Sequence, residues 1–588
     1  MAGSSGNAFD FKLFKRLLAH TNKYRLTFYF VAFAAIAMSV LGVLTPHLLE
    51  TAIDKAIIPK DWDGLVFYVS LMVIVLVAEV IFQFGFIFYA NWLGQNVIRD
   101  IRVKLFKLML SFKMQYFDKS AVGRLTTRAV NDIETIASIF SQGLFMIISD
   151  LLKMLVIAGV LLYKSWEMAL IVFTILPFLL YATRLFQRAM KSAFEDVRNQ
   201  VANLNSFVQE RITGMKIVQL FAREETEFKA FKKINEKHKK AWIKTVWYNS
   251  IFFPIAEMSS SIAIGLVVWY GGLNATQNGE ITLGIVTAFI QYAQMLFRPL
   301  RQIADKFNTL QMGMVAANRV FKILDTRSHI TDNGIIELNQ TTGLIEFENV
   351  RFGYIENEEV IKGISFTVPP GQTIALVGAT GAGKSTIINL LSRFYEINSG
   401  DILIDNVSIK DYTLPSLRDR IAVVLQDVFL FADTIFKNIT LGDETISEEE
   451  VIEAAKEIGV HKFITSLPGG YHYNVRERGT MLSSGQRQLI AFLRAYVSKP
   501  SILVLDEATS SIDSYSEEMI QTATDKITKG RTSIVIAHRL ATIKKADQIL
   551  VMDAGKIVEK GTHKELLRKE NGFYKSLYEV QFMAEEAI

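Results

Sequence analysis

The chain has 588 residues, half of them hydrophobic, and a mean hydropathy of +0.25. That length exceeds a single domain, and so much apolar sequence is rare in a soluble globular protein, so we expect a membrane part. The small net charge of +5 gives no support for nucleic-acid binding, which needs a concentrated basic surface. The chain has no cysteine, which excludes disulfides and thiolate metal sites and leaves the redox compartment undecided.

Residues 9–20 (FDFKLFKRLLAH) place apolar side chains at helical spacing among basic ones. This pattern predicts an amphipathic helix on the inner surface of the membrane, ahead of the first long apolar run. The alternative is a short soluble cap helix, because the segment has only twelve residues.

Long apolar runs follow, each long enough to cross a hydrocarbon core of about 30 Å. We expect six spanning helices, near residues 25–47, 64–90, 137–163, 166–185, 247–272 and 281–304. Several runs continue into polar sequence with neither Gly nor Pro to end them. The helices should therefore extend well beyond the bilayer.

The charges of the loops predict the orientation of the spans. The segments between spans two and three and between spans four and five are rich in Lys and Arg, whereas residues 271–282 contain neither. The positive-inside rule then places the basic segments, both termini and the C-terminal half in the cytoplasm of a multi-pass protein of the cell membrane. The two basic segments are expected to form long cytoplasmic helical hairpins, although solvated helix faces or lipid-surface anchors are alternatives.

Short β-rich runs alternate with helical patterns after residue 343. They are Leu344–Val350, Thr373–Val377, Ile421–Leu425, Ile502–Leu505, Thr532–Ile536 and Gln548–Met552. This alternation predicts a mainly parallel sheet flanked by helices, with an antiparallel portion near its start. We divide the chain into a transmembrane domain at 1–322, with an N-terminal elbow helix and six spans, a linker at 323–342 and an α/β domain at 343–588.

A glycine-rich loop separates the second β-rich run from a helical pattern. Residues 378–386 (GATGAGKST) match G-x-x-x-x-G-K-[ST], in which backbone N–H groups and a helix N-terminus converge on phosphates. Lys384 would reach the β- and γ-phosphates, and the Ser385 hydroxyl would ligate Mg²⁺. The predicted phosphate site comprises Gly378, Thr380, Gly381, Ala382, Gly383, Lys384, Ser385 and Thr386.

Two carboxylates end a continuous apolar run at Ser501–Glu507. Such a run suits a strand buried on both faces, and α/β sheets place their ligands at the carboxyl ends of strands. Asp506 would hold Mg²⁺ directly or through water, and Glu507 would polarise the attacking water. Alone, an acidic pair there is as often a helix cap, but the glycine loop favours the catalytic interpretation.

The run Leu482, Ser483, Ser484, Gly485 and Gln486 precedes a helical pattern and lies shortly before Asp506. With these motifs in this order, the chain resembles an ATP-binding cassette exporter over nearly its whole length, a half-transporter with membrane and nucleotide domains fused. The resemblance implies ATP and Mg²⁺ as cofactors. It also implies a membrane α-helical bundle with long cytoplasmic extensions, joined to an α/β P-loop nucleotide-binding domain.

Residue roles follow from the resemblance. Tyr354 would stack on adenine, although a tyrosine on the sheet surface is the alternative. Gln426 would touch Mg²⁺ and the lytic water, and His538 would contact the γ-phosphate; an exposed loop Gln and a structural His are the simpler interpretations. Asp513 belongs to a loop that would cross to the partner cassette, and residues 477–479 to a segment that would contact the intracellular helices.

The family's nucleotide sites are completed between two cassettes, and this chain has one. The signature at residues 482–486 would act on the partner's ATP, so the chain must pair with a second half-transporter. Ser484 stands where the usual signature has its first Gly, while Glu507 and His538 are intact. This combination resembles the catalytically competent member of an unequal pair, so we favour a heterodimer, with a homodimer as the alternative.

The resemblance implies export of hydrophobic or amphipathic compounds, drugs or lipids, by alternating access. Segments 115–118 and 221–225 resemble the coupling corners of the helical hairpins, although each could be an ordinary helix–helix corner. Four charges expected at membrane depth bear on cargo: Glu79, Asp150, Lys153 and Glu257. Asp150 and Lys153, spaced i,i+3, are expected to neutralise one another, which leaves Glu257 as the best candidate for polarity in the cavity. A peptide exporter and a cassette-gated channel or regulatory membrane protein are the alternative functions.

Overall fold

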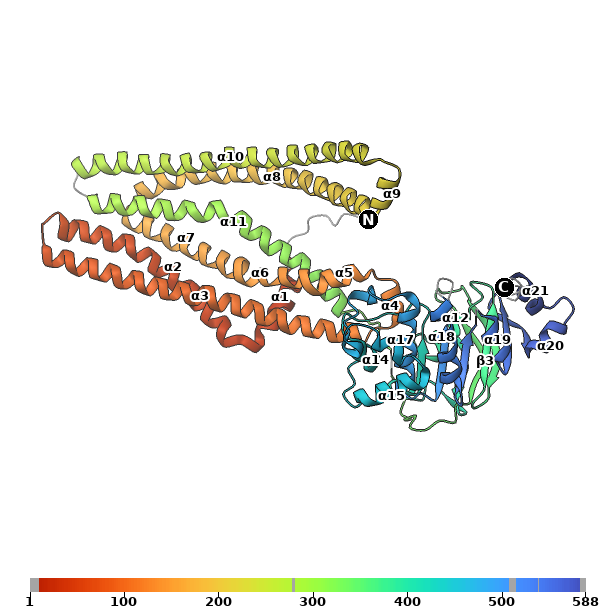
Figure 1. The fold of residues 1–588 in the computed structure, drawn as a ribbon. Helices are drawn as coiled ribbons and strands as arrows, with labels where there is room; N and C mark the ends of the chain where they lie inside the picture. The colour runs from red at the N-terminus through yellow and green to blue at the C-terminus, as the bar shows by residue number, and fades with distance from the viewer. Residues whose placement is uncertain (1–9, 278–280, 331, 507–513, 538, 582–588) are drawn as a thin grey trace. The chain divides into compact units, whose positions relative to one another are not determined.

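The computed structural model describes residues 10–277, 281–330, 332–506, 514–537 and 539–581 (Figure 1). The chain forms two compact units. The first comprises Met1–Leu110 and Ala121–Arg327, and the second comprises Ser111–Ser120 and Ser328–Ile588. The later boundary falls inside the predicted linker, residues 323–342. The short stretch 111–120 belongs to the second unit although it lies between two helices of the first.

The first unit is built from helices, most of them long. They are α1 (Phe11–Ala19), α2 (Arg25–Ala52), α3 (Trp62–Leu110), α5 (Val122–Thr127), α6 (Ile133–Ser138), α7 (Phe145–Lys164), α8 (Trp166–Thr213), α9 (Met215–Leu220), α10 (Glu224–Gln277) and α11 (Leu283–Leu324), with π-helical turns at Ile53–Ile57, Arg128–Asp132 and Ile139–Leu144. Helices α8 and α10 lie side by side as a hairpin closed by α9 (Figure 1).

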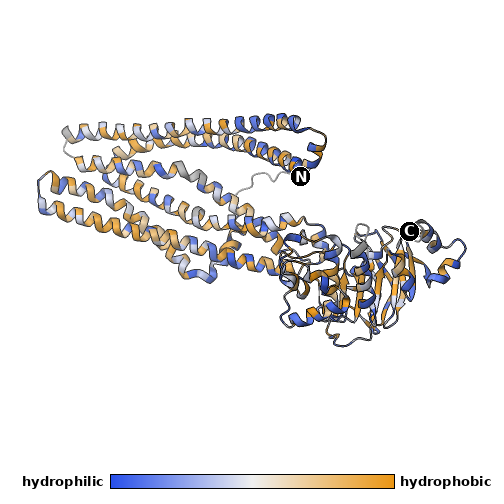
Figure 2. Cartoon of the chain, viewed as in Figure 1, coloured by the Kyte–Doolittle hydropathy of each residue, from blue (hydrophilic) through white to orange (hydrophobic). Residues whose placement is uncertain are grey.

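In the part of the chain that the structure describes, five stretches of helix are long and apolar enough to cross a membrane. They are Phe11–Ile57, Trp62–Leu110, Val122–Lys164, Trp166–Thr213 and Glu224–Ala275, with hydropathy between 1.9 and 2.7 over their most apolar windows. All exceed the ~20 residues that a bilayer requires, so the helices extend beyond the spans as predicted. Apolar residues run along these helices, and polar residues dominate the α9 end of the α8–α10 hairpin (Figure 2).

The sixth expected span, near residues 281–304, lies in α11. This helix forms, but within the described part of the chain it does not reach the apolarity of the other five. Gln291, Gln294 and Arg298 dilute its apolar run. A crossing by α11 therefore remains a prediction.

The N-terminal amphipathic helix is present as α1. The Asp10 carboxylate caps it by accepting hydrogen bonds from the backbone N–H groups of Lys12 and Leu13. On its packed face Phe14 and Leu17 are buried, and the Arg16 guanidinium pairs with Asp325 beyond the end of α11 at 2.6 Å. Its contact with a membrane surface remains a prediction.

Two sheets form the centre of the second unit. The strands are β1 (Ile345–Phe352), β2 (Ile361–Val368), β3 (Thr373–Gly378), β4 (Ser399–Ile404), β5 (Val407–Ser408), β6 (Ile421–Val424), β7 (Ile502–Asp506), β8 (Thr532–Ile536), β9 (Gln548–Asp553) and β10 (Lys556–Gly561). The smaller sheet is antiparallel in the order β2-β1-β4-β5. The larger has the order β10-β9-β3-β8-β7-β6, parallel from β9 to β6. The predicted parallel sheet and its early antiparallel portion are confirmed.

Helices α12 (Lys384–Leu391), α13 (Leu414–Arg420) and α17 (Ser484–Val497) contact strands of the larger sheet. The other helices of the second unit are α14 (Ile435–Thr440), α15 (Glu448–Ile458), α16 (His461–Thr465), α18 (Ser514–Thr528), α19 (Leu540–Lys545), α20 (His563–Arg568) and α21 (Phe573–Gln581), and α4 (Met114–Asp118) lies in segment 111–120. Alternate residues of β3 enter two different hydrophobic cores: Ile374 and Leu376 one, Ala375 and Val377 the other. The strand is therefore buried on both faces, as a continuous apolar run predicts.

Candidate nucleotide-binding site

The parallel sheet brings the two predicted phosphate motifs to one edge. Strands β3 and β7 both pair with β8, and their carboxyl ends carry Gly378 and Asp506. The Ser385 hydroxyl, at the start of α12, donates a hydrogen bond to the Asp506 carboxylate at 3.2 Å. Two of the three residues predicted to touch Mg²⁺ therefore meet although 121 positions separate them in the sequence.

Backbone geometry explains the glycines of the loop. A Cβ at Gly378 would lie 2.2 Å from the carbonyl oxygen of Met552, so only glycine lets β3 pass β9 at this point. Gly381 and Gly383 have φ of +84° and +100°, the left-handed region that side chains rarely adopt. Gly383 is also the N-cap of α12, so the turn directs the N-terminal N–H groups of that helix into the loop.

The Lys384 side chain folds back onto the phosphate-binding loop. Its ammonium donates to the carbonyl oxygens of Gly378 at 2.5 Å and Ala379 at 3.0 Å, and the residue is buried. Burial lowers the pKa of Lys384, and the Asp506 carboxylate acts in the opposite direction. The ammonium therefore lies beside the loop's carbonyls with its charge only partly compensated, which suits it to an incoming phosphate.

The donors at this edge fit a magnesium nucleotide. Mg²⁺ is bound by one or two protein oxygens together with substrate phosphates, and the Ser385 hydroxyl and the Asp506 carboxylate supply such oxygens. This set suits a metal carried in with its substrate.

Tyr354 contacts the same helix. Its hydroxyl lies 3.3 Å from the Thr386 hydroxyl and accepts a hydrogen bond from the Asn389 side-chain amide at 3.2 Å. The predicted adenine contact is therefore attached to the first turns of α12. Asn389 stands in no motif that predicts this contact, although its i,i+3 spacing from Thr386 places both on one face of the helix.

Gln426 and the signature lie in separate parts of the second unit's sequence, after β6 and at the start of α17. Gln426 is exposed two residues after β6. Ser483 caps α17 in a capping box: its hydroxyl accepts from the N–H of Gln486 at 3.2 Å, and the Gln486 amide oxygen accepts from the N–H of Ser483 at 3.0 Å. Leu482 and Gly485 are buried, while Ser483 and Ser484 are exposed. Glu507, Asp513 and His538, the remaining predicted site residues, lie outside the described residues.

The predicted neutralisation of Asp150 by Lys153 is wrong. Asp150 pairs instead with Lys306 of α11, 156 residues away. Lys153 points to Gly42, where an added Cβ would lie 2.9 Å from its ammonium and 3.2 Å from the Glu79 carboxylate. The i,i+3 spacing failed as a guide because packing against α11 offered Asp150 a better placed opposite charge. Glu257, the predicted source of cavity polarity, is exposed.

Comparison with known proteins agrees with these sites. The ABC transporter transmembrane region matches residues 28–300, and the ABC transporter family matches residues 361–510. The chain is 36% identical over 573 residues to the uncharacterized ABC transporter ATP-binding protein YknV of Bacillus subtilis (strain 168), covering 96% of this chain and 94% of that protein.

Two further relatives have more informative names. The ATP-dependent lipid A-core flippase of Syntrophus aciditrophicus (strain SB) is 34% identical, with 97% of this chain and 94% of the relative covered. The probable multidrug resistance ABC transporter ATP-binding/permease protein YheH of B. subtilis (strain 168) is 36% identical, with 88% and 77% covered. The chain belongs to the ABC transporters, with the transmembrane region and the ATPase fused in one polypeptide, and it couples ATP hydrolysis to movement of a substance across a membrane.

Proposed function

We propose that two half-transporters, of which this chain is one, export hydrophobic or amphipathic compounds, drugs or lipids, from the cytoplasmic side of the cell membrane. The observation that carries this proposal is the meeting of Ser385 and Asp506 at the carboxyl edge of the sheet, in a chain whose described residues include five apolar helical stretches that suit a bilayer. The relatives named for lipid A-core and for multidrug resistance support the cargo class.

The residues of the site divide the chemistry of ATP hydrolysis among them. The loop N–H groups and Lys384 bind the phosphates, and Ser385 and Asp506 hold Mg²⁺, which neutralises charge on the β- and γ-phosphates when bound. Glu507 follows the last residue of β7 directly and accepts a proton from the attacking water. Gln426 and His538 orient that water and the γ-phosphate. Closure of two cassettes around ATP then drives alternating access through the long helices.

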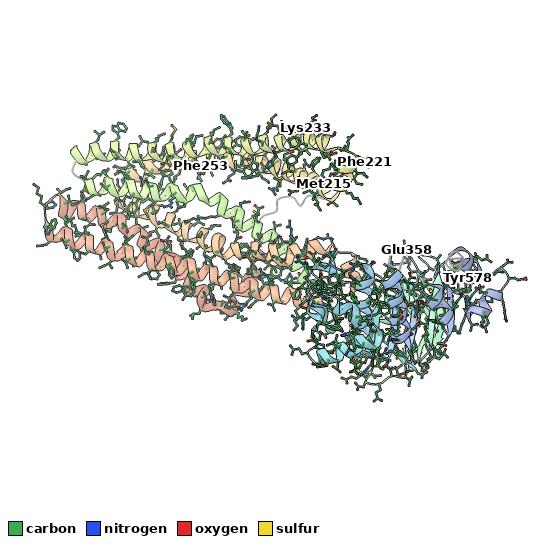
Figure 3. All side chains as sticks on the ribbon, in the orientation of Figure 1. Met215, Phe221, Lys233, Phe253, Glu358 and Tyr578 are labelled. Atoms are coloured by element: carbon green, nitrogen blue, oxygen red, sulfur yellow. The ribbon has the colours of Figure 1, made fainter. Side chains whose placement is uncertain are left out.

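Pairing accounts for exposed apolar surface on both units. At the end of the α8–α10 hairpin, Met215 and Phe221 project from the α9 corner (Figure 3), and Ile217 and Leu220 are also exposed. On the second unit Leu425, Phe429, Phe431 and Met481 are exposed. A dimer of half-transporters would cover such surface and bring the exposed Ser483 of one chain to the other's nucleotide. The combination of Ser484 with an intact Glu507 and His538 in the sequence favours an unequal pair.

The proposal is tested in liposomes. Vanadate-sensitive ATPase activity is measured with and without candidate partner chains, against a panel of drugs, lipids and peptides. Stimulation by amphiphiles supports the proposal, stimulation by peptides alone would favour a peptide exporter, and ion conductance without cargo movement would favour a channel.

One substitution tests the catalytic carboxylate. Glu507→Gln is expected to reduce turnover by at least about 100-fold while ATP still binds, because the amide cannot accept the proton of water. Hydrolysis at the normal rate by this variant would remove Glu507 from the proposed role.

A further inference from the structure

Segment 111–120 is tied to the second unit near both of its ends. At its start, the backbone N–H of Lys113 donates to the carbonyl oxygen of Ser328 at 2.7 Å. Phe112, only 5% exposed, forms a β-bridge with His329. Toward its end, the Asp118 carboxylate accepts a hydrogen bond from the Tyr395 hydroxyl. The second tie reaches the nucleotide-binding core itself, because Tyr395 follows α12 by four residues.

Tyr395 also packs against the predicted adenine contact. Its ring meets the Tyr354 ring edge-on, with centroids 5.0 Å apart and planes at 88°, and it lies 5.8 Å from the Phe352 ring. Edge-to-face contact is a favourable geometry for aromatic rings. Tyr354 is thus held at two points: Thr386 and Asn389 of α12 hold its hydroxyl, and Tyr395 holds its ring. A continuous series of contacts joins Asp118 to the phosphate-binding helix.

We propose that Tyr395 is a positioning residue for ATP. It couples the docking of segment 111–120 on the rest of the second unit to the position of the Tyr354 ring. While Asp118 accepts the hydroxyl hydrogen bond, Tyr395 fixes Tyr354 for stacking on adenine. When segment 111–120 undocks, Tyr395 loses that hydrogen bond, and its ring no longer fixes the Tyr354 ring from the side. Since such coupling is reciprocal, bound adenine favours the docked segment. The inference rests on the proposed contact between Tyr354 and adenine.

The surroundings of Tyr395 suit this role. The side chain is half-buried, and burial first, then the hydrogen bond to Asp118, raise the pKa of its hydroxyl above the ordinary value. The hydroxyl therefore keeps its proton and remains a donor at physiological pH. Asp118 is exposed, so its replacement removes the acceptor without opening a cavity.

The experiment uses the full-length protein in lipid nanodiscs. The dissociation constant of ATP, measured by displacement of a fluorescent ATP analogue, and the KM and kcat of ATP hydrolysis are compared among variants. Tyr395→Phe keeps the ring but removes the hydroxyl, and Asp118→Ala removes its acceptor. Each is expected to raise the KM and the dissociation constant for ATP about threefold to tenfold, with kcat changed less than about twofold. Their combination is expected to add little to either change alone.

Three further variants complete the design. Asp118→Asn retains an acceptor oxygen and is expected to recover part of the affinity lost in Asp118→Ala. Tyr496→Phe is the matched control, because the Tyr496 hydroxyl donates to the Glu457 carboxylate at 2.6 Å on helices α17 and α15. It is expected to leave ATP affinity unchanged. Tyr354→Ala tests the adenine contact directly and is expected to raise the KM for ATP more than Tyr395→Phe does.

The outcomes separate the inference from its premise. An unchanged KM in Tyr395→Phe, fully additive effects of the two substitutions, or a fall in kcat at constant KM would overturn the positioning role and leave the adenine contact in place. If Tyr354→Ala does not change ATP affinity, the adenine contact and the inference fall together.

Discussion

Two short helices at the corners of helical hairpins have opposite surroundings. Beside α4, Phe112 is 5% exposed and packs against the rings of Tyr116 and His329 within the second unit. Beside α9, Phe221 is 66% exposed and Leu220 is 72% exposed. Both corners carry apolar side chains, yet the chain covers only the first of them. On the proposed function, the first corner would serve the chain's own cassette and the second would be left for a partner.

The largest effect is expected from a substitution at the buried corner beside α4. Phe112→Ala removes a buried ring and is expected to weaken the docking of segment 111–120 by about 3 kcal/mol. Hydrogen exchange of the full chain, followed at the Lys113 amide that bonds Ser328, should show roughly 100-fold lower protection. Phe221→Ala is the matched control and should leave this amide unchanged. Equal effects of the two substitutions would contradict the contrast between the corners.

The next largest effect is expected from a substitution at the exposed corner beside α9. Phe221→Asp introduces a charge where the proposed partner would bury an apolar side chain, and it is expected to lower cargo-stimulated ATPase activity about tenfold. Because the side chain is exposed in the single chain, the unfolding temperature should stay within about 1 °C. Activity in liposomes and thermal unfolding in detergent are measured on the same preparation. Full stimulated activity in this variant would show that the α9 corner docks nowhere.

Local patterns predicted the elements that carry the candidate nucleotide site, because each motif is contiguous in the sequence. The loop at residues 378–386 specifies its own turn, and the apolar run before Asp506 specifies a buried strand. The rule that parallel strands present their carboxyl ends together then brought Ser385 to Asp506.

The remaining features depend on packing that no local pattern encodes. Tyr395 and Asp118 are 277 residues apart, and neither stands in a motif that names the other. Asp150 has a nearby candidate in Lys153, yet it pairs with Lys306, because helix packing chose between two available cations. Sequence spacing therefore predicts the groups that a motif holds together and fails where several partners compete in space.

Two helices of the second unit begin with the same capping box, but only one of the two boxes is proposed to face the partner chain. Ser447 caps α15 with Glu450, and Ser483 caps α17 with Gln486 in the same geometry. Ser447→Ala and Ser483→Ala should each cost their own helix about 1 kcal/mol, seen as faster local hydrogen exchange. Only Ser483→Ala should also lower ATP turnover in the assembled transporter, because its hydroxyl is proposed to face the partner's γ-phosphate. Equal turnover in the two variants would make Ser483 a cap and nothing more.

The smallest expected effect separates the two boxes by pH. The Ser447 backbone N–H, then Lys499, lowers the pKa of Glu450 below its ordinary value, whereas Gln486 does not titrate. A carboxylate with a depressed pKa stabilises the fold above its unfolded pKa of about 4.3, and this contribution disappears as the pH falls through the lower folded pKa.

Between about pH 5 and pH 3, α15 should therefore loosen relative to α17. Hydrogen exchange of peptides covering the two helix starts, corrected for the intrinsic rate at each pH, measures this difference. Glu450→Gln gives α15 the same box as α17 and should abolish the difference. Parallel loosening of both helices in the unmodified chain would mean that general acid unfolding, and not the Glu450 cap, governs this region.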